Sequence, residues 1–394
     1  MKFNKWTLGL AAVGAVSMAS AVRADEAPKL VPVNTALSST VLSGYVDVGA
    51  QYNMGNYGPG AGVPAGTAGN IAVAGFNPIN KIDNFTLNNV VVSLDKSQDE
   101  SPWASGYHID LNLGTDAVGL GLNNVTTEGT GTVAIRQGYV IVRTPVGNGI
   151  DWKVGVQDDI IGYEGNTDGA NPNYTRSIGY TVEPTSLVGL IGSYKIIDGV
   201  TVQGGIANAL SGNTTGLFGS SFPSSDKTIA AALALTAPDS WGWAKGATLS
   251  AGTLLSIDKK GQDNYYAGIT VPTPLSILKV GASFDLVSVN NAGGANSKND
   301  SGWVLGAYGV LQPTDKLAFN LRGECYDLAG AFSPYGGTNG KGEEVTATLQ
   351  YNLWANVISR AELRWDHTDT GGAFSNNGSN ADSFLLAANL IYTF

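Results

Sequence analysis

The chain has 394 residues and is acidic, with 32 Asp and Glu residues against 22 Lys and Arg residues. Because it has no basic run, we expect no nucleic-acid partner. Its hydropathy is near zero, and no second long apolar segment follows the N-terminus. These features exclude a protein that crosses a membrane with helices, but they fit one that crosses with alternating strands.

The first 24 residues have the pattern of a secretory signal peptide. Lys2 and Lys5 precede an apolar run that is too short to cross a bilayer, and small residues follow it. We therefore predict a cleaved signal peptide over 1–24 and a periplasmic lead-in over 25–40. The folded domain is expected over 41–394, without a disulfide, because the chain has one cysteine.

Alternating apolar and polar residues predict β-strands along the rest of the chain, because successive side chains of a strand point to opposite faces. The cleanest examples are 42–52, 107–113, 317–325, 357–365 and 384–394. The alternation slips around 84–95 and 132–143. There we expect either a β-bulge or a different register.

The connections between the predicted strands alternate in length. Seven are short, several of them built from turn residues: 96–104, 144–150, 197–199, 238–246, 272–274, 312–315 and 352–355. Eight are longer and rich in Gly, Asn and Asp: 54–82, 114–131, 158–184, 211–225, 258–263, 290–300, 328–342 and 368–381. This alternation predicts an all-β fold, a transmembrane antiparallel up-and-down β-barrel of sixteen strands. Its short turns would be periplasmic, its long loops extracellular, and its lumen wide enough for water.

The last predicted strand ends at the chain's own terminus. Every second residue from Phe384 to Phe394 is apolar, and the row ends with Tyr392 and Phe394. A closing strand with a terminal Phe resembles the assembly signal of bacterial outer-membrane barrels. Tyr392 and Phe394 are therefore the candidate signal for the barrel-assembly machinery, with outer-membrane lipid around the barrel. The alternative is the last strand of a soluble all-β domain.

The stretch 138–208 resembles a known family. It contains TPVG at 144–147, a segment from Gly155 to Gly-Tyr-Glu at 162–164, and NPNYTRS at 171–177. These motifs are similar to those of the OmpL-like β-barrel porin family of Gram-negative bacteria, and residues 359–366 resemble its charged penultimate strand. The resemblance implies a porin-like barrel and carries no substrate with it.

The inner face of the predicted barrel carries charged side chains. The candidate pore-lining residues are His108, Asp110, Lys153, Arg322, Glu324, Glu344, Arg360, Glu362, Arg364 and Asp366. The last seven form a mixed-sign ladder on three neighbouring strands. Such a ladder would be expensive to bury in a dry core, so we expect it to face water. It would either stiffen the wall as a salt-bridge network or select solutes, and the sequence leaves both open.

The third long loop, 158–184, is a candidate constriction, because in general porins the third loop folds into the lumen. Its candidate residues are Asp158, Asp159, Glu164, Asp168 and Arg176. The alternative is an ordinary extracellular loop. The predicted inner wall has seven basic and seven acidic residues, whereas this loop is net acidic. A loop inside the lumen would therefore give a mild preference for cations.

Catalytic and metal-binding patterns are weak. His108 and His367 have no Ser or Cys partner nearby in sequence, and two histidines with one thiol are too few for a zinc site. We predict no enzyme, no metal and no cofactor. The sequence favours an outer-membrane porin for passive diffusion of small hydrophilic solutes or ions, with a homo-trimer as its candidate assembly. The alternative is a non-conducting barrel that acts as a surface binding or structural protein through its loops.

Overall fold

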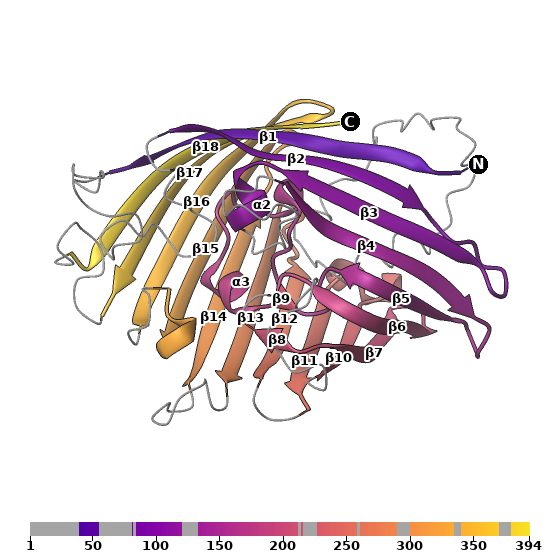
Figure 1. Cartoon of the computed structure of the whole chain (residues 1–394). Coiled ribbons are helices and arrows are strands. Elements are labelled where there is room, and N and C mark those ends of the chain that lie inside the picture. Colours follow the sequence, from indigo (N-terminus) through magenta and orange to yellow (C-terminus); the bar gives the residue numbers. More distant parts are fainter. Residues whose placement is uncertain are drawn as a thin grey trace.

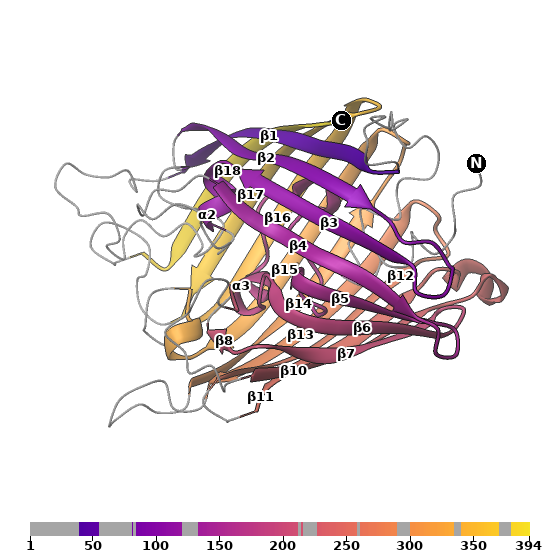
Figure 2. The same cartoon turned by 45° about the vertical axis from the view of Figure 1, so that its right-hand side comes forward.

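The computed structural model describes residues 39–54, 81, 84–119, 133–211, 214–215, 227–257, 261–289, 300–334, 340–369 and 380–394. The predicted signal peptide and nearly all of the lead-in lie outside the described residues. Within them, sixteen strands form one closed antiparallel barrel, in which each strand pairs with its neighbours in chain order (Figures 1 and 2). The predicted fold class and strand number are confirmed.

The first half of the barrel consists of β1 (Val41–Asn53), β2 (Phe85–Lys96), β3 (Ser105–Leu113), β4 (Val133–Thr144), β5 (Ile150–Gln157), β6 (Leu187–Ile197), β7 (Val200–Asn208) and β10 (Lys227–Thr236). The second half consists of β11 (Thr248–Ser256), β12 (Gln262–Pro272), β13 (Leu278–Val289), β14 (Asp300–Leu311), β15 (Leu317–Leu328), β16 (Gly340–Trp354), β17 (Val357–Thr368) and β18 (Asp382–Thr393). The smaller elements are α2 (Thr115–Gly119), η3 (Asp168–Ala170), α3 (Ile178–Val182), β8 (Leu210–Ser211), β9 (Thr214–Thr215), η4 (Asp239–Ala244) and η5 (Gly330–Phe332).

The barrel closes by pairing β1 with β18. The Phe394 N–H donates to the Gly44 carbonyl at 3.0 Å, and the Gly44 N–H donates to the Phe394 carbonyl at 3.1 Å. A closed sheet leaves no unpaired strand edge, and bilayer hydrocarbon could not satisfy one. No helix among the described residues is long and apolar enough to cross a membrane.

Both places where the alternation slips are irregularities in strand pairing. The β1–β2 register shifts between Asp47 and Val48, opposite residues 87–89, and the β3–β4 register shifts between Asp110 and Leu111, opposite residues 135–137. An extra residue in one strand reverses the side-chain alternation beyond it. The sequence pattern therefore slips at the positions where the strand pairing itself shifts.

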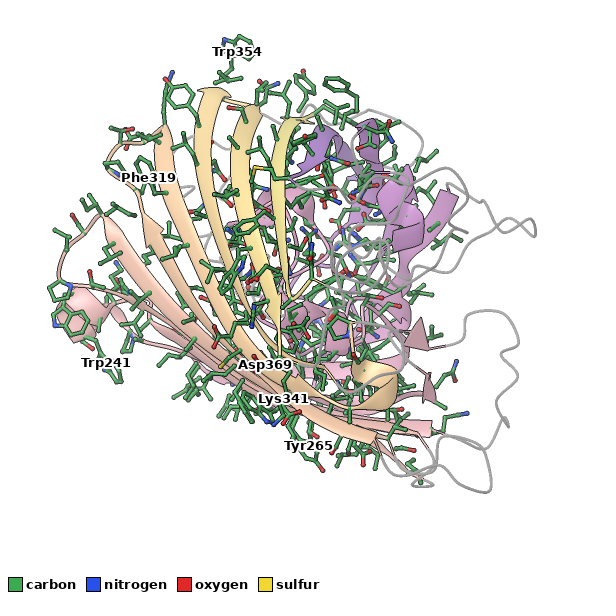
Figure 3. The ribbon with its side chains drawn as sticks, turned by 90° about the vertical axis from the view of Figure 1, so that its left-hand side faces the viewer. Trp241, Tyr265, Phe319, Lys341, Trp354 and Asp369 are labelled. Carbon is green, nitrogen blue, oxygen red and sulfur yellow. The ribbon has the colours of Figure 1, made fainter. Side chains whose placement is uncertain are left out.

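The outer wall is apolar and has aromatic residues toward both ends. On β18, the alternate residues Phe384 to Phe394 are exposed, and the residues between them are mostly buried. Figure 3 shows Trp241, Phe319 and Trp354 toward the short-turn end, with Tyr265, Lys341 and Asp369 toward the other end. An apolar band with aromatic side chains at its edges is the usual exterior of an outer-membrane barrel.

The connection between β5 and β6, residues 158–186, lies inside the barrel, and we call it the inner loop (Figures 1 and 2). It carries η3 and α3. Ile160, Ile161 and Tyr163 at its start pack against buried wall residues, which include Leu187, Leu254 and Tyr308. The interior is therefore a packed core on the side where the loop contacts the wall.

Candidate functional site

The inner loop is held in place first by its own side chains. The Asn171 side chain accepts from the Gly165 N–H at 2.9 Å and donates to the Gly165 and Thr167 carbonyls at 2.7 and 3.0 Å, which fixes a turn. The Ser177 hydroxyl accepts from the Tyr180 N–H at 3.0 Å and caps α3. Both residues belong to the NPNYTRS motif, so the motif itself fixes part of the loop's conformation.

The apolar start of the inner loop docks on β12 to β14 through one tyrosine. The Tyr163 ring stacks on Tyr308 with 3.9 Å between centroids, and its hydroxyl is 3.0 Å from the Thr270 hydroxyl. Gly281 on β13 makes this approach possible, because a Cβ at that position would lie 1.8 Å from the Tyr163 hydroxyl oxygen. The absence of a side chain at Gly281 therefore leaves the room that the Tyr163 hydroxyl occupies.

Two wall carboxylates accept hydrogen bonds from backbone N–H groups of the inner loop. Glu362 on β17 accepts from Tyr174 at 2.6 Å and from Thr175 at 2.9 Å. Glu324 on β15 accepts from Ile178 at 2.6 Å and from Gly179 at 3.0 Å. Each carboxylate therefore binds two consecutive N–H groups, and Glu324 satisfies the first two donors of α3.

Three wall arginines donate to backbone carbonyls of the same loop. Arg360 donates to the Asp168 carbonyl at 3.0 Å and to the Asn171 carbonyl at 2.6 Å. Arg322 donates to the Thr175 carbonyl at 2.8 Å. Arg364 donates to the Arg176 carbonyl at 2.7 Å. The carboxylates of the ladder thus accept hydrogen bonds from backbone N–H groups of the loop, and its arginines donate hydrogen bonds to backbone carbonyls of the loop.

Ion pairs complete the ladder. Arg322 lies 2.8 Å from Glu164 of the loop and 3.1 Å from Glu344 of β16, and Arg364 lies 2.8 Å from Asp366. All five side chains have exposed fractions of 5% or less. The expectation that the ladder faces water is therefore corrected. Its residues point inward, but the inner loop covers them and supplies the partners that make their burial affordable.

The other three candidate pore-lining residues lie on a different part of the wall, on β3 and β5. His108 lies 3.0 Å from both Asp95 and Asp110 and stacks on Tyr139. The Lys153 ammonium group lies 4.6 Å from the centre of the Tyr139 ring. His108 and Lys153 stay partly exposed, whereas Asp110 is buried.

The five candidate constriction residues differ in their partners. Asp158 pairs with Arg136 of β4 at 2.6 Å, Asp168 pairs with Arg176 at 2.8 Å, and Glu164 pairs with the ladder as described. Asp159 forms no ion pair with a described residue, and its Oδ2 atom is buried without a hydrogen-bond partner.

Asp159 and Glu183 are the two inner-loop carboxyls whose environment disfavours ionisation. Burial raises the pKa of Asp159 well above its usual range, and the nearby Asp158 and Asp285 carboxylates add to this. Burial, followed by Asp285 and Asp159, likewise raises the pKa of Glu183.

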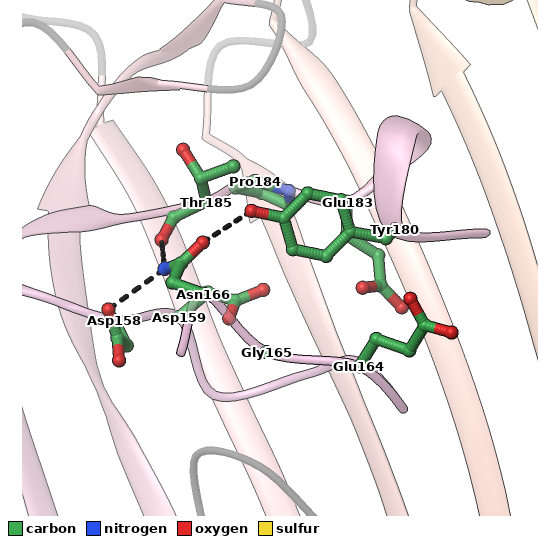
Figure 4. Close-up of a pocket in the computed structure, with 9 residues that line it drawn as sticks. All are labelled: Asp158, Asp159, Glu164, Gly165, Asn166, Tyr180, Glu183, Pro184 and Thr185. Carbon is green, nitrogen blue, oxygen red and sulfur yellow. Dashed lines mark hydrogen bonds between the residues drawn. The ribbon is translucent and has the colours of Figure 1, made fainter. Parts of the chain in front are cut away.

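These carboxyls border a small pocket, shown in Figure 4, whose free space of about 10 Å³ is enough for about one water molecule. Its lining residues are Asp158, Asp159, Glu164, Gly165, Asn166, Tyr180, Glu183, Pro184 and Thr185. The Asn166 amide donates to Asp158 at 2.9 Å and to the Thr185 carbonyl at 2.8 Å, and it accepts from the Tyr180 hydroxyl. In the described part of the chain, no group of three His, Cys, Asp or Glu side chains could hold a metal ion.

Several loop partners were not among the candidates from sequence. Asn173 donates to Thr348, and the Tyr174 hydroxyl contacts both Gln51 and Asn88 across the barrel. The NPNYTRS motif contains Asn173 and Tyr174 and was the available signal. Their wall partners are ordinary inward polar residues, and nothing local marks them.

Sixteen closed strands, an apolar exterior and a long loop folded inward define a porin-type barrel of the outer membrane. A family profile described as "Putative beta-barrel porin-2, OmpL-like" matches residues 39–394, and the chain belongs to this family. No curated protein sequence matches the chain.

Solved structures share the fold at low sequence identity. The outer-membrane channel DcaP of Acinetobacter baumannii is 13% identical, with a TM-score of 0.61, over 90% of this chain and 97% of that chain. OmpT of Vibrio cholerae in its trimer form is 12% identical, with a TM-score of 0.56, over 90% and 99%. An anion-selective porin from Comamonas acidovorans is 10% identical, with a TM-score of 0.55, over 90% and 99%.

Proposed function

We propose that this protein is a porin through which small hydrophilic solutes or ions diffuse passively along a water path narrowed by the inner loop. The observation that carries the proposal is the unequal exposure of the inner wall. Inward side chains under the loop are buried, whereas Lys153 on β5, Ser193 on β6, Gln203 on β7 and Ser250 on β11 keep exposed surface. A polar, partly exposed inner wall is typical of a water-filled lumen.

The proposed path leads along β5 to the start of the inner loop. Lys153 is partly exposed, and Asp158, beyond the end of the same strand, is 24% exposed although it pairs with Arg136. Solvent therefore reaches the acidic pocket at the base of the loop. Charged groups at a narrow point act strongly on passing ions, because bulk salt screens them least there.

One observation favours a second function, a barrel closed by its own loop. Of the 27 residues from 160 to 186, 22 are buried, so both sides of the loop are largely covered. Such a protein would act at the surface through its extracellular loops and would conduct no ions.

Conductance of the purified protein in a planar bilayer separates the two functions. The porin proposal expects discrete current steps in KCl, and Lys153→Glu should shift the reversal potential toward cations. Lys341→Glu is the matched control, because Lys341 lies on the outer face. Folded protein that gives no steps supports the closed barrel, and equal shifts in both variants contradict a path along β5.

We further propose that the chain is exported by the signal peptide 1–24, inserted by the barrel-assembly machinery and assembled as a homo-trimer in outer-membrane lipid. The trimer form of OmpT supports the last point. Mass measurement in detergent tests it. The proposed function includes no catalytic step, metal or cofactor.

A further inference from the structure

One contact between the inner loop and the wall joins two acids. Glu183 directly follows α3, Asp285 lies on β13, and their side chains share a hydrogen bond. Both residues are 3% exposed. Two carboxylates offer only acceptors to each other, so this hydrogen bond contains a proton. Among the described residues, no Lys, Arg or His forms an ion pair with either acid.

The other contacts that hold the inner loop contain their own compensation. Glu324 accepts two N–H groups at the start of α3, and Arg322 pairs with Glu164. These contacts persist over the whole pH range in which the carboxyl groups are ionised. The contact of Glu183 with Asp285 is different, because loss of its proton leaves two negative charges next to each other in a buried place.

Glycines of the inner loop pack closely against both carboxyl groups. A Cβ at Gly162 would lie 2.5 Å from the Glu183 Oε2 atom, and a Cβ at Gly179 would lie 2.9 Å from the Asp285 Oδ2 atom. Each carboxyl group is therefore confined on one side by the backbone of the loop itself. Repulsion between two charged groups in this place favours movement of the loop away from β13, which lets water in.

We propose that Glu183 and Asp285 form a proton-dependent latch, which holds α3 and the residues after it against the wall while the pair keeps its proton and releases them when the proton is lost. The Glu362 contacts with Tyr174 and Thr175 hold the middle of the loop in either state. The latch goes beyond the porin function, because it concerns loop docking whether or not ions pass. Its effect on a current, a wider path after release, rests on the porin function.

Protonation of Glu183 favours the docked loop. In the docked state, burial and the nearby carboxylates raise its pKa well above the ordinary value of 4.5, whereas water restores the ordinary value in a released loop. A carboxyl group whose pKa is higher in the docked state stabilises docking while it is protonated. This stabilisation is complete below 4.5 and is lost as the pH rises from there through the docked value.

Several charged and titratable groups face the latch. They are Asp158, Asp159, Glu164 and Tyr180 of the loop, Arg136 of β4, Tyr266 of β12, and Arg322 and Glu324 of β15. The two basic groups are engaged, because Arg136 pairs with Asp158 at 2.6 Å and Arg322 pairs with Glu164 at 2.8 Å. The other groups are acids and tyrosines, which disfavour a second negative charge on the pair.

Hydrogen exchange of the full chain in detergent tests the latch with the variant Glu183→Gln. Gln donates to Asp285 at every pH and has no proton to lose, so it keeps the latch closed. The two proteins are compared at the same pH, because intrinsic exchange itself depends on pH. The peptide 178–187 should exchange alike in both near pH 4.5. Above that pH, the ratio of wild-type to variant exchange should rise by up to tenfold per pH unit until the docked pKa is reached.

Glu343→Gln is the matched control, because Glu343 lies on the outer face, and it should exchange as the wild type does at every pH. Retained heat-modifiable mobility shows that each barrel is folded, and Asp285→Asn replaces Glu183→Gln if that variant misfolds. A ratio that stays constant as the pH rises overturns the latch, even in a protein that conducts. A rising ratio supports the latch even in a protein that gives no current, and the missing current then contradicts the porin function alone.

Discussion

Replacing Glu362 by Gln should loosen the inner loop without opening the barrel. Glu362 is buried and accepts hydrogen bonds from the N–H groups of Tyr174 and Thr175 at 2.6 and 2.9 Å and from the Thr348 hydroxyl at 2.7 Å. A Gln of the same shape offers one acceptor oxygen and one NH₂ donor. The donor would face a backbone N–H and leave it unsatisfied.

The expected cost follows from these contacts. Loss of charge-assisted bonding and one unsatisfied buried N–H together cost about 3 kcal/mol. Because about 1.4 kcal/mol is a factor of ten in an equilibrium constant, local opening of the loop should rise roughly a hundredfold. The β16–β17 and β17–β18 ladders do not depend on this side chain, so the barrel should remain closed.

Hydrogen exchange followed by mass spectrometry measures the opening directly. The peptide containing Tyr174 and Thr175 should exchange about a hundredfold faster in the variant, while strand peptides should be unchanged. Glu343→Gln is the control, because Glu343 is the exposed neighbour of buried Glu344. If exchange at Tyr174 and Thr175 equals that of the control, the carboxylate does not hold the loop.

Three further changes test other parts of the structure. Phe394→Ser should lower the amount of barrel in the outer membrane while the Gly44 backbone pairing persists in barrels that do form; wild-type levels on a heat-modifiability gel would contradict an assembly role. Leu321→Arg should cost about 2–4 kcal/mol in unfolding free energy if that outward residue lies near the bilayer midplane, and a neutral result in a lipid-vesicle folding titration would place it elsewhere. Gly281→Ala should displace Tyr163, costing about 1–3 kcal/mol of loop docking, with faster exchange at 160–164; unchanged exchange would show that the loop adapts.

The strands could be predicted from sequence because their signals are local. Side-chain alternation predicts which face of the sheet each residue occupies, so Arg322 and Glu362 point inward as their positions in the pattern require. The length of each connection predicts at which end of the barrel it lies. Even the two slips in the pattern correspond to real shifts in strand pairing.

The course of the inner loop is not a local property. Glu362 and its partner Tyr174 are 188 residues apart, and the groups that Glu362 binds are backbone N–H groups, which every residue except Pro carries. A backbone partner leaves no mark in the sequence. The charged ladder can be buried because the loop brings peptide N–H and C=O groups to it, and these groups cannot be located from the sequence.

The same pairing changes the basis of the ion preference. Three of the five loop carboxylates are neutralised by arginines, which leaves Asp159 and Glu183 to act on passing ions. Because their pKa values are raised above the usual carboxyl range, a larger fraction of each ionises as the pH rises above that range, so cation preference should grow with pH. It should also grow as salt is diluted, because the charges are then screened less and their field extends further. Reversal potentials in a KCl gradient measure both trends. Asp159→Asn with Glu183→Gln should remove the pH dependence, whereas a pH-dependent anion preference in the wild type would mean that other charges control the path.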